Sequence, residues 1–94
     1  MLTITENALD LVRRIPKQPM LPSTAGLRIS RSTADHGGLN VKAEEEPRKG
    51  DRVVDRDGAR VFVGERAVSA VKDKVLDARF DSSGRIEFLL SAPA

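Results

Sequence analysis

The sequence predicts an α+β domain that is mainly β: a compact antiparallel β sandwich or roll with an N-terminal helix and a second helix before the last hairpin. Three observations predict this fold. Apolar residues near the N-terminus recur at helical spacing, most of those after residue 26 alternate with polar ones, and turn signals separate the alternating segments. Because a chain of 94 residues suits one domain, we expect 1–94 to form a single domain with a frayed tail at 90–94.

The N-terminal helix is expected to begin at Thr5, a residue type that often caps helices, and to end before Pro16, which cannot continue one. Four residues at helical spacing predict its apolar stripe: Ala8, Leu11, Val12 and Ile15. A short apolar start precedes the helix at 2–4, and a proline-rich surface loop is expected at 16–25.

The remaining segments predict strands and one further helix. Residues 26–32 and 39–45 alternate as half-buried strands do. Asp57-Gly58 is a strong hairpin signal between two valine-rich strands, and Ser83-Gly84 is the turn of a last hairpin. Helical spacing returns at 65–74. The apolar phase of these elements predicts a buried core: Leu11, Val12, Leu27, Ile29, Val61, Val63, Val71, Phe80, Ile86 and Phe88.

Composition argues against several classes of function. The chain has no cysteine, which excludes disulfides, thiolate nucleophiles and cysteine-ligated metal sites. Its net charge is only +2, basic and acidic residues are interleaved, and aromatic residues make up 3%, so we expect no nucleic-acid partner. No apolar segment is long enough to cross a bilayer, and the N-terminus lacks the layout of a signal peptide, so we expect no membrane partner and a cytoplasmic location.

Four stretches, in order along nearly the whole chain, carry a resemblance to a known family. They are ITENALDLV at 4–12, GLRI at 26–29, DRVVDRDGARVFVGERA at 51–67 and GRIEF at 84–88. Together they resemble the HesB/IscA family of A-type iron–sulfur carriers. The resemblance implies the compact HesB-like fold, a tendency to form dimers or other homo-oligomers, and a link to iron–sulfur cluster assembly.

The chemistry of that family rests on three cysteines, and the resemblance does not extend to them. Counted without gaps from Leu27, the position of the first cysteine falls on His36. The other two lie in the family shortly after the closing strand, and the sequence ends at Ala94 before that segment would begin. Iron–sulfur clusters need thiolate ligands, which histidine replaces only in part, so we expect a degenerate carrier that binds no cluster.

His36 and Asp35 are the candidate metal ligands, because His36 is the one histidine and lies in the family's key turn. Metal sites usually need three or four ligands, so an exposed turn residue is the simpler interpretation and any metal binding is expected to be weak. The glycines of this turn and the next apolar residue, Gly37, Gly38 and Leu39, are the candidate interface.

Other polar clusters have ordinary structural explanations. Consecutive acidic residues at 44–46 cannot converge on one face of a strand, and Asp55 and Asp57 lack the further ligands of a calcium loop. Ser82-Ser83-Gly84 has no general base and is a turn. We therefore expect that the protein is not an enzyme and that it acts through protein–protein contacts. The alternative is a metal (iron) binding protein that uses His36 and carboxylates.

Overall fold

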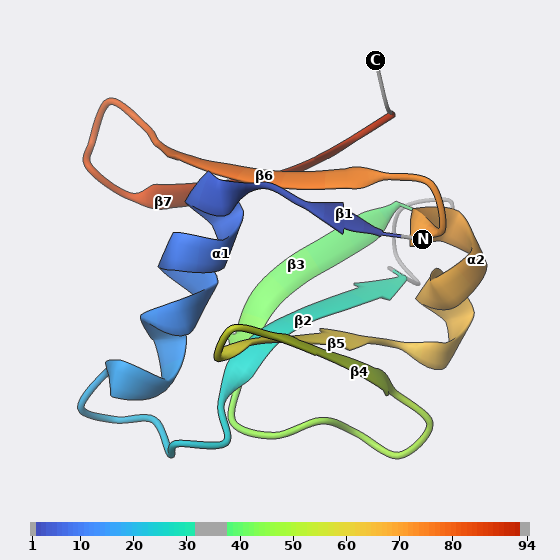
Figure 1. Ribbon diagram of the computed structural model, residues 1–94, viewed down its shortest axis with the longest axis horizontal. Coiled ribbons are helices and arrows are strands. Elements are labelled where there is room, and N and C mark those ends of the chain that lie inside the picture. Colours follow the sequence, from blue (N-terminus) through green and yellow to red (C-terminus); the bar gives the residue numbers. More distant parts are fainter. Residues whose placement is uncertain (1, 32–37, 93–94) are drawn as a thin grey trace.

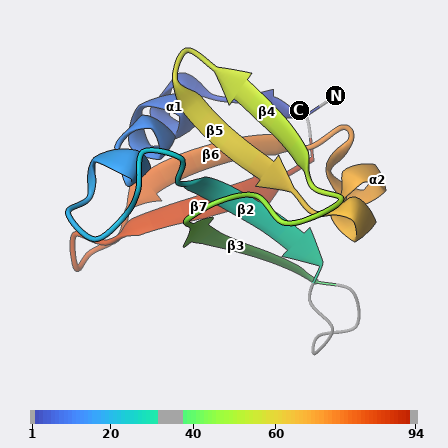
Figure 2. The same cartoon turned by 90° about the horizontal axis from the view of Figure 1, so that it is seen from below.

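The computed structural model describes residues 2–31 and 38–92, which form two β-sheets packed against each other with a helix at either end (Figures 1 and 2). The three-stranded sheet has the order β1-β6-β7, and the four-stranded sheet has the order β3-β2-β5-β4. The elements are β1 (Thr3–Ile4), α1 (Glu6–Arg13), the 3₁₀ turn η1 (Ile15–Lys17), β2 (Gly26–Arg31), β3 (Leu39–Glu44), β4 (Arg52–Arg56), β5 (Ala59–Val63), the 3₁₀ turn η2 (Glu65–Ala67), α2 (Val68–Val71), β6 (Val75–Phe80) and β7 (Ile86–Ser91).

The start of α1 is fixed by Thr5, as the sequence predicts. The Thr5 hydroxyl oxygen accepts a hydrogen bond from the backbone N–H of Ala8 at 3.2 Å, and the hydroxyl donates to Oδ1 of Asp77 at 2.6 Å. This second bond ties the helix start to β6, and it holds the pKa of the Asp77 carboxyl below its ordinary value. The buried face of α1 consists of Ala8, Leu9, Leu11 and Val12.

The sheets are mixed rather than purely antiparallel, which corrects one part of the predicted fold. β2 pairs antiparallel with β3 but parallel with β5, and β1 pairs parallel with β6. The connection after β3 carries the chain across the sheet to its other edge, where β4 runs antiparallel to β2. The hairpin then reverses the chain, so that β5 enters beside β2 in the parallel direction.

Glycine is required at two positions, at Gly58 because of the backbone conformation and at Gly26 because of close packing. Asp57 and Gly58 both have positive φ, 52° and 85°, as the tight β4–β5 hairpin requires. Gly26 lies at the start of β2, close to the backbone of β5. A Cβ atom there would be 2.5 Å from the carbonyl oxygen of Arg60 and 2.9 Å from Cζ of Phe62.

Most of the predicted core is buried between the two sheets, where it packs with residues that the prediction omitted, such as Leu76 and Ala78. The predicted residues that are buried are Leu11, Val12, Leu27, Ile29, Val61, Val63 and Val71. Three others differ from the prediction: Phe80 and Ile86 are exposed, at 58% and 44%, and Phe88 is half-buried.

The strand phase at these three positions is right, but their place along the hairpin decides their exposure. Phe80 pairs with Ile86 next to the turn, and Ala78 pairs with Phe88 one step further in. The apolar face of β6 and β7 therefore continues toward the tip of the hairpin, beyond the layers that bury Leu76 and Ala78.

The outer face of the four-stranded sheet has a small polar layer of its own. Arg28 on β2 donates from Nε and Nη2 to the two carboxylate oxygens of Asp51, each at 2.9 Å. The backbone N–H of Arg48 also donates to Asp51 at 2.9 Å. The side chains of Arg28 and Asp51 are 13% and 1% exposed, so the Arg28 guanidinium keeps the pKa of the Asp51 carboxyl below its usual value.

Candidate interaction surface

The residues singled out for metal binding lie outside the part of the chain that the structure describes. Asp35, His36 and Gly37 fall in the gap between residues 31 and 38, so the predicted metal site and part of the predicted interface stay predictions. Within the described residues, no group of three histidine, aspartate or glutamate side chains could hold a metal ion.

Gly38 and Leu39, the described part of the predicted interface, border a hollow at one side of the sandwich. This hollow of about 410 Å³ is also lined by Val41 on β3 and by Phe88 and Leu90 on β7. A second hollow of about 390 Å³ shares Val41 and Phe88 and extends to Ile86 and the end of α1. We call this surface the β3–β7 groove, defined by Leu39, Val41, Ile86, Phe88 and Leu90.

The groove exists because two sheet edges lie on the same side of the molecule. β3 is the outer strand of the four-stranded sheet and β7 is the outer strand of the three-stranded sheet. Leu39 and Val41 alternate with exposed residues on β3, and Ile86, Phe88 and Leu90 alternate on β7, so each strand presents an apolar face. α1 and α2 lie at the two ends of the sandwich (Figure 1), and Leu11 of α1 lines one end of the groove.

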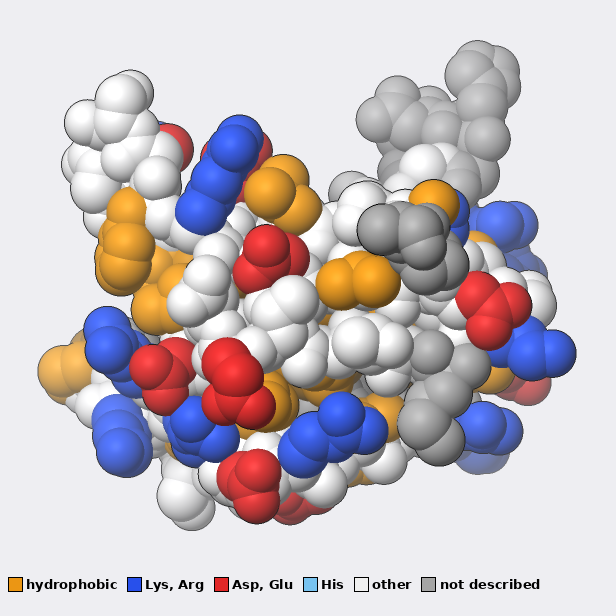
Figure 3. All heavy atoms as spheres, turned by 45° about the horizontal axis from the view of Figure 1, so that its top comes forward, with side chains coloured by type: hydrophobic (Ala, Val, Ile, Leu, Met, Phe, Trp, Pro, Cys, Tyr) orange, Lys and Arg blue, Asp and Glu red, His pale blue; other side chains and the backbone are white. Residues whose placement is uncertain are grey.

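Several charged side chains near the groove form ion pairs with one another. Glu44 accepts from Lys42 at 3.3 Å and from Arg48 at 3.2 Å, and Arg79 pairs with Glu87 at 3.0 Å. On the face in Figure 3, basic and acidic side chains are likewise interspersed, with apolar side chains exposed between them. The groove thus combines apolar side chains with a basic border of Arg14, Lys42 and Lys74, and such a mixed surface suits contact with another protein surface.

Two of the remaining polar clusters form turns, as the sequence predicts. Asp57-Gly58 forms the β4–β5 turn. At the β6–β7 turn, the Asp81 carboxylate accepts from the backbone N–H groups of Ser83 and Arg85, at 2.8 and 3.0 Å. Glu44 is engaged by Lys42 and Arg48, and the next two glutamates are exposed.

Sequence reasoning missed the groove itself, because it assigned Ile86 and Phe88 to the core. Alternation identifies the apolar face of a strand but does not tell whether that strand lies at the edge or the centre of its sheet. The polar pair of Arg28 and Asp51 was missed as well, since the two residues are 23 positions apart and carry no local signal.

Solved structures with a similar fold include the following three. SufA from Escherichia coli, which is involved in the biosynthesis of iron–sulfur clusters, matches with a TM-score of 0.75 and 26% identity over 98% of this chain and 85% of its own. IscA with its [2Fe-2S] cluster matches with a TM-score of 0.69 and 18% identity, over 99% of this chain and 86% of its own. A protein from Aquifex aeolicus, solved by solution NMR, matches with a TM-score of 0.68 and 18% identity, over 98% of this chain and 91% of its own.

No protein-family model matches the sequence, and no curated protein sequence matches it either. Among the described residues, no helix is long and apolar enough to cross a lipid bilayer.

Proposed function

Because the chain is a HesB/IscA-like protein with the fold of SufA and IscA but without cysteine, we propose that it acts through protein contacts and binds no cluster. It is not an enzyme in this proposal, and its link to iron–sulfur cluster assembly is that of a binding partner. The observation that carries the proposal is the β3–β7 groove, where apolar side chains of two edge strands lie at the surface.

The absence of a cluster follows from ligand chemistry. The iron–sulfide core is held by soft thiolate sulfur, and the sequence offers none. Anaerobic reconstitution with iron and sulfide should therefore leave the protein colourless after desalting. Stoichiometric iron and sulfide that stay with the protein, together with visible absorbance, would contradict this part of the proposal.

The groove favours a second copy of the chain as its occupant. Leu39, Val41, Phe88 and Leu90 are all half-buried, so each keeps apolar surface that a partner could remove from water. β3 and β7 also have an outer side that no described strand pairs with, and such edges readily accept another strand. A two-fold dimer would place the same groove on both sides of the contact, with Arg14 and Lys74, which also line it, in the polar rim of the interface.

Sedimentation velocity at tens of micromolar tests this contact. We expect the wild type to sediment as a dimer and Leu39→Asp to sediment as a monomer, because the carboxylate would be buried without a partner. Val53→Asp is the matched control. Val53 is an exposed valine on the edge strand β4, 41% exposed, and it does not line the groove, so this variant should stay dimeric.

A pull-down from native lysate, with the same three proteins as bait, covers the case of a different partner. A wild type that stays monomeric, and that captures the same proteins as Leu39→Asp, would refute the role of the groove. Far-UV circular dichroism of each variant confirms that a lost contact does not reflect a lost fold.

The second candidate is metal binding by His36 with Asp35, which the position of His36 in the family's key turn favours. Purification without a histidine tag, followed by metal analysis of the wild type and of His36→Ala, distinguishes the two candidates. Iron or zinc near one equivalent in the wild type alone would favour the metal-binding role.

A further inference from the structure

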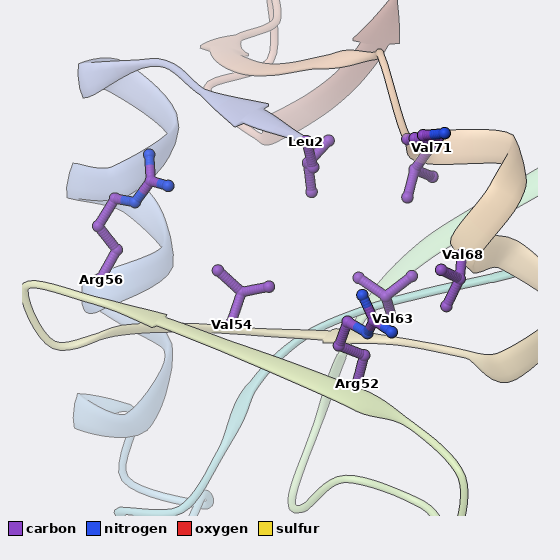
Figure 4. A pocket seen from close by; sticks show the side chains of 8 residues that line it. Leu2, Arg52, Val54, Arg56, Val63, Val68 and Val71 are labelled. Carbon is purple, nitrogen blue, oxygen red and sulfur yellow. The ribbon is translucent and has the colours of Figure 1, made fainter.

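A separate hollow of about 410 Å³ opens on the other side of the sandwich, between β4 and α2 (Figure 4). It shares no lining residue with the β3–β7 groove. β4 and β1 are the outer strands on this side, and β1 has only two residues. The short strand leaves the inward face of β4 partly uncovered, which is why a cavity remains between the sheets.

The walls of this hollow are aliphatic. Leu2, Val63 and Val71 are buried, with exposures of 8%, 3% and 3%, and they form its inner part. Val54 and Val68 are half-buried and complete the walls, and the labelled side chains of all five residues point toward a common space in Figure 4. The lining contains no aromatic, hydroxyl or amide side chain, so it offers neither stacking nor neutral hydrogen-bonding groups.

The rim of the hollow is cationic. Arg52 and Arg56 flank Val54 on the same face of β4, because alternate residues of a strand share a face, and Lys72 follows α2. Among the described residues that line the hollow, none is acidic. Within the part of the chain that the structure describes, these three cations form no ion pair with a carboxylate, whereas Arg28 is paired with Asp51 and Arg79 with Glu87.

This combination selects a class of ligand. The volume falls within the roughly 300–1,000 Å³ of small-molecule sites. Aliphatic walls favour a hydrocarbon body, and arginine side chains at the mouth favour an anionic head, since a guanidinium can bind a carboxylate through two parallel hydrogen bonds. We propose that the hollow binds a medium-chain carboxylate, with its chain between β4 and α2 and its head at the cationic rim that Arg52, Arg56 and Lys72 form.

Titration with octanoate, followed by ¹⁵N–¹H NMR of the intact protein, tests the proposal. The amide shifts should be saturable and confined to residues of β4, α2 and the start of the chain. Hexanoate and decanoate should show that each added methylene lowers the Kd by about fourfold, as burial of a methylene predicts. Octanamide, which has the same chain but no charge, should bind more weakly.

Variants distinguish the contribution of the aliphatic walls to octanoate binding from that of the cationic rim. Val54→Phe fills the hollow from β4 and should abolish octanoate binding in a protein that remains folded. Arg52→Gln and Arg56→Gln should each weaken binding by about two- to fivefold, the range for partly exposed charge pairs. Arg85→Gln is the control, because Arg85 is exposed at the β6–β7 turn and does not line the hollow; it should bind octanoate as the wild type does.

Several results would overturn the proposal. One such result is a set of amide shifts that spread over all basic residues and do not depend on the chain length of the carboxylate. Another is binding that Val54→Phe leaves unchanged. Co-sedimentation with phosphatidylglycerol vesicles without saturable octanoate binding would also overturn it, because the rim would then act as a flat basic surface. If no probe binds, the inward arginines of β4 serve only to discourage pairing at this edge.

Discussion

Removal of the Asp51 carboxylate should destabilise the protein more than removal of other paired carboxylates. In Asp51→Ala, Arg28 would lose both hydrogen bonds of its guanidinium while its side chain stays 13% exposed. The backbone N–H of Arg48 would lose its acceptor as well. The pair is only partly buried, so leaving the Arg28 guanidinium without its acceptor should cost about 2–3 kcal/mol. This loss is large for a domain whose total free energy of unfolding is on the order of 5–10 kcal/mol.

The matched control is Glu87→Ala. Glu87 also pairs with an arginine, Arg79, at 3.0 Å, but the two side chains are 43% and 64% exposed, so the loss should be below about 1 kcal/mol. The double variant Arg28→Met/Asp51→Leu should recover much of the loss, because no charge is then left buried. The sequence has no tryptophan or tyrosine, so urea denaturation followed by far-UV circular dichroism is the suitable assay.

The pH dependence of this pair has a definite sign. The pKa of Asp51 is lower in the folded than in the unfolded state, so its ionised form stabilises the fold above the unfolded pKa of about 4. That stabilisation is lost as the pH falls through the folded pKa, and the difference between wild type and Asp51→Ala should shrink there. A loss below about 1 kcal/mol at neutral pH, or a difference that grows on acidification, would refute the reasoning.

Two further predictions concern packing, and both use the same denaturation assay. Phe62→Ala should cost about 3–5 kcal/mol because Phe62 is fully buried. Phe88→Ala should cost clearly less because Phe88 is half-buried. Equal losses for the two variants would contradict the assigned burial. Gly26→Ala should cost about 1–3 kcal/mol because its Cβ would meet the backbone of Arg60. Gly84→Ala should lose about 1 kcal/mol of stability from its φ of 80° alone, since its Cβ would meet nothing within 4 Å. A greater loss at Gly84 than at Gly26 would argue against the close contact between Gly26 and Arg60.

Local signals predicted the elements of the fold well. Thr5 caps α1, Asp57-Gly58 turns the β4–β5 hairpin, and the alternation around Leu27 and Ile29 marks a buried strand. The structural neighbours confirm the HesB/IscA resemblance that the four sequence stretches indicated. These signals succeed because each depends on residues a few positions apart.

Features that depend on distant neighbours could not be predicted in the same way. Alternation places Phe80 and Ile86 on the apolar face of their strands, but their exposure depends on how far the hairpin extends past the opposing layer. The parallel pairing of β2 with β5 has no local signature, because each strand is flanked by ordinary hairpin or loop sequence. For the same reason the groove between β3 and β7 could be identified only from the arrangement of both sheets.

The pairing of β1 with β6 has a consequence for how the chain folds. Thr3 pairs with Val75, and the Thr5 hydroxyl donates a hydrogen bond to Asp77, 72 positions further along the chain. The parallel pairing of β2 and β5 must likewise wait for the hairpin that delivers β5. Closing such long loops is entropically costly and slows folding relative to domains built from local contacts. The N-terminal segment therefore stays unpaired until β6 is in place, so that the pairing of β1 belongs to a late step of folding.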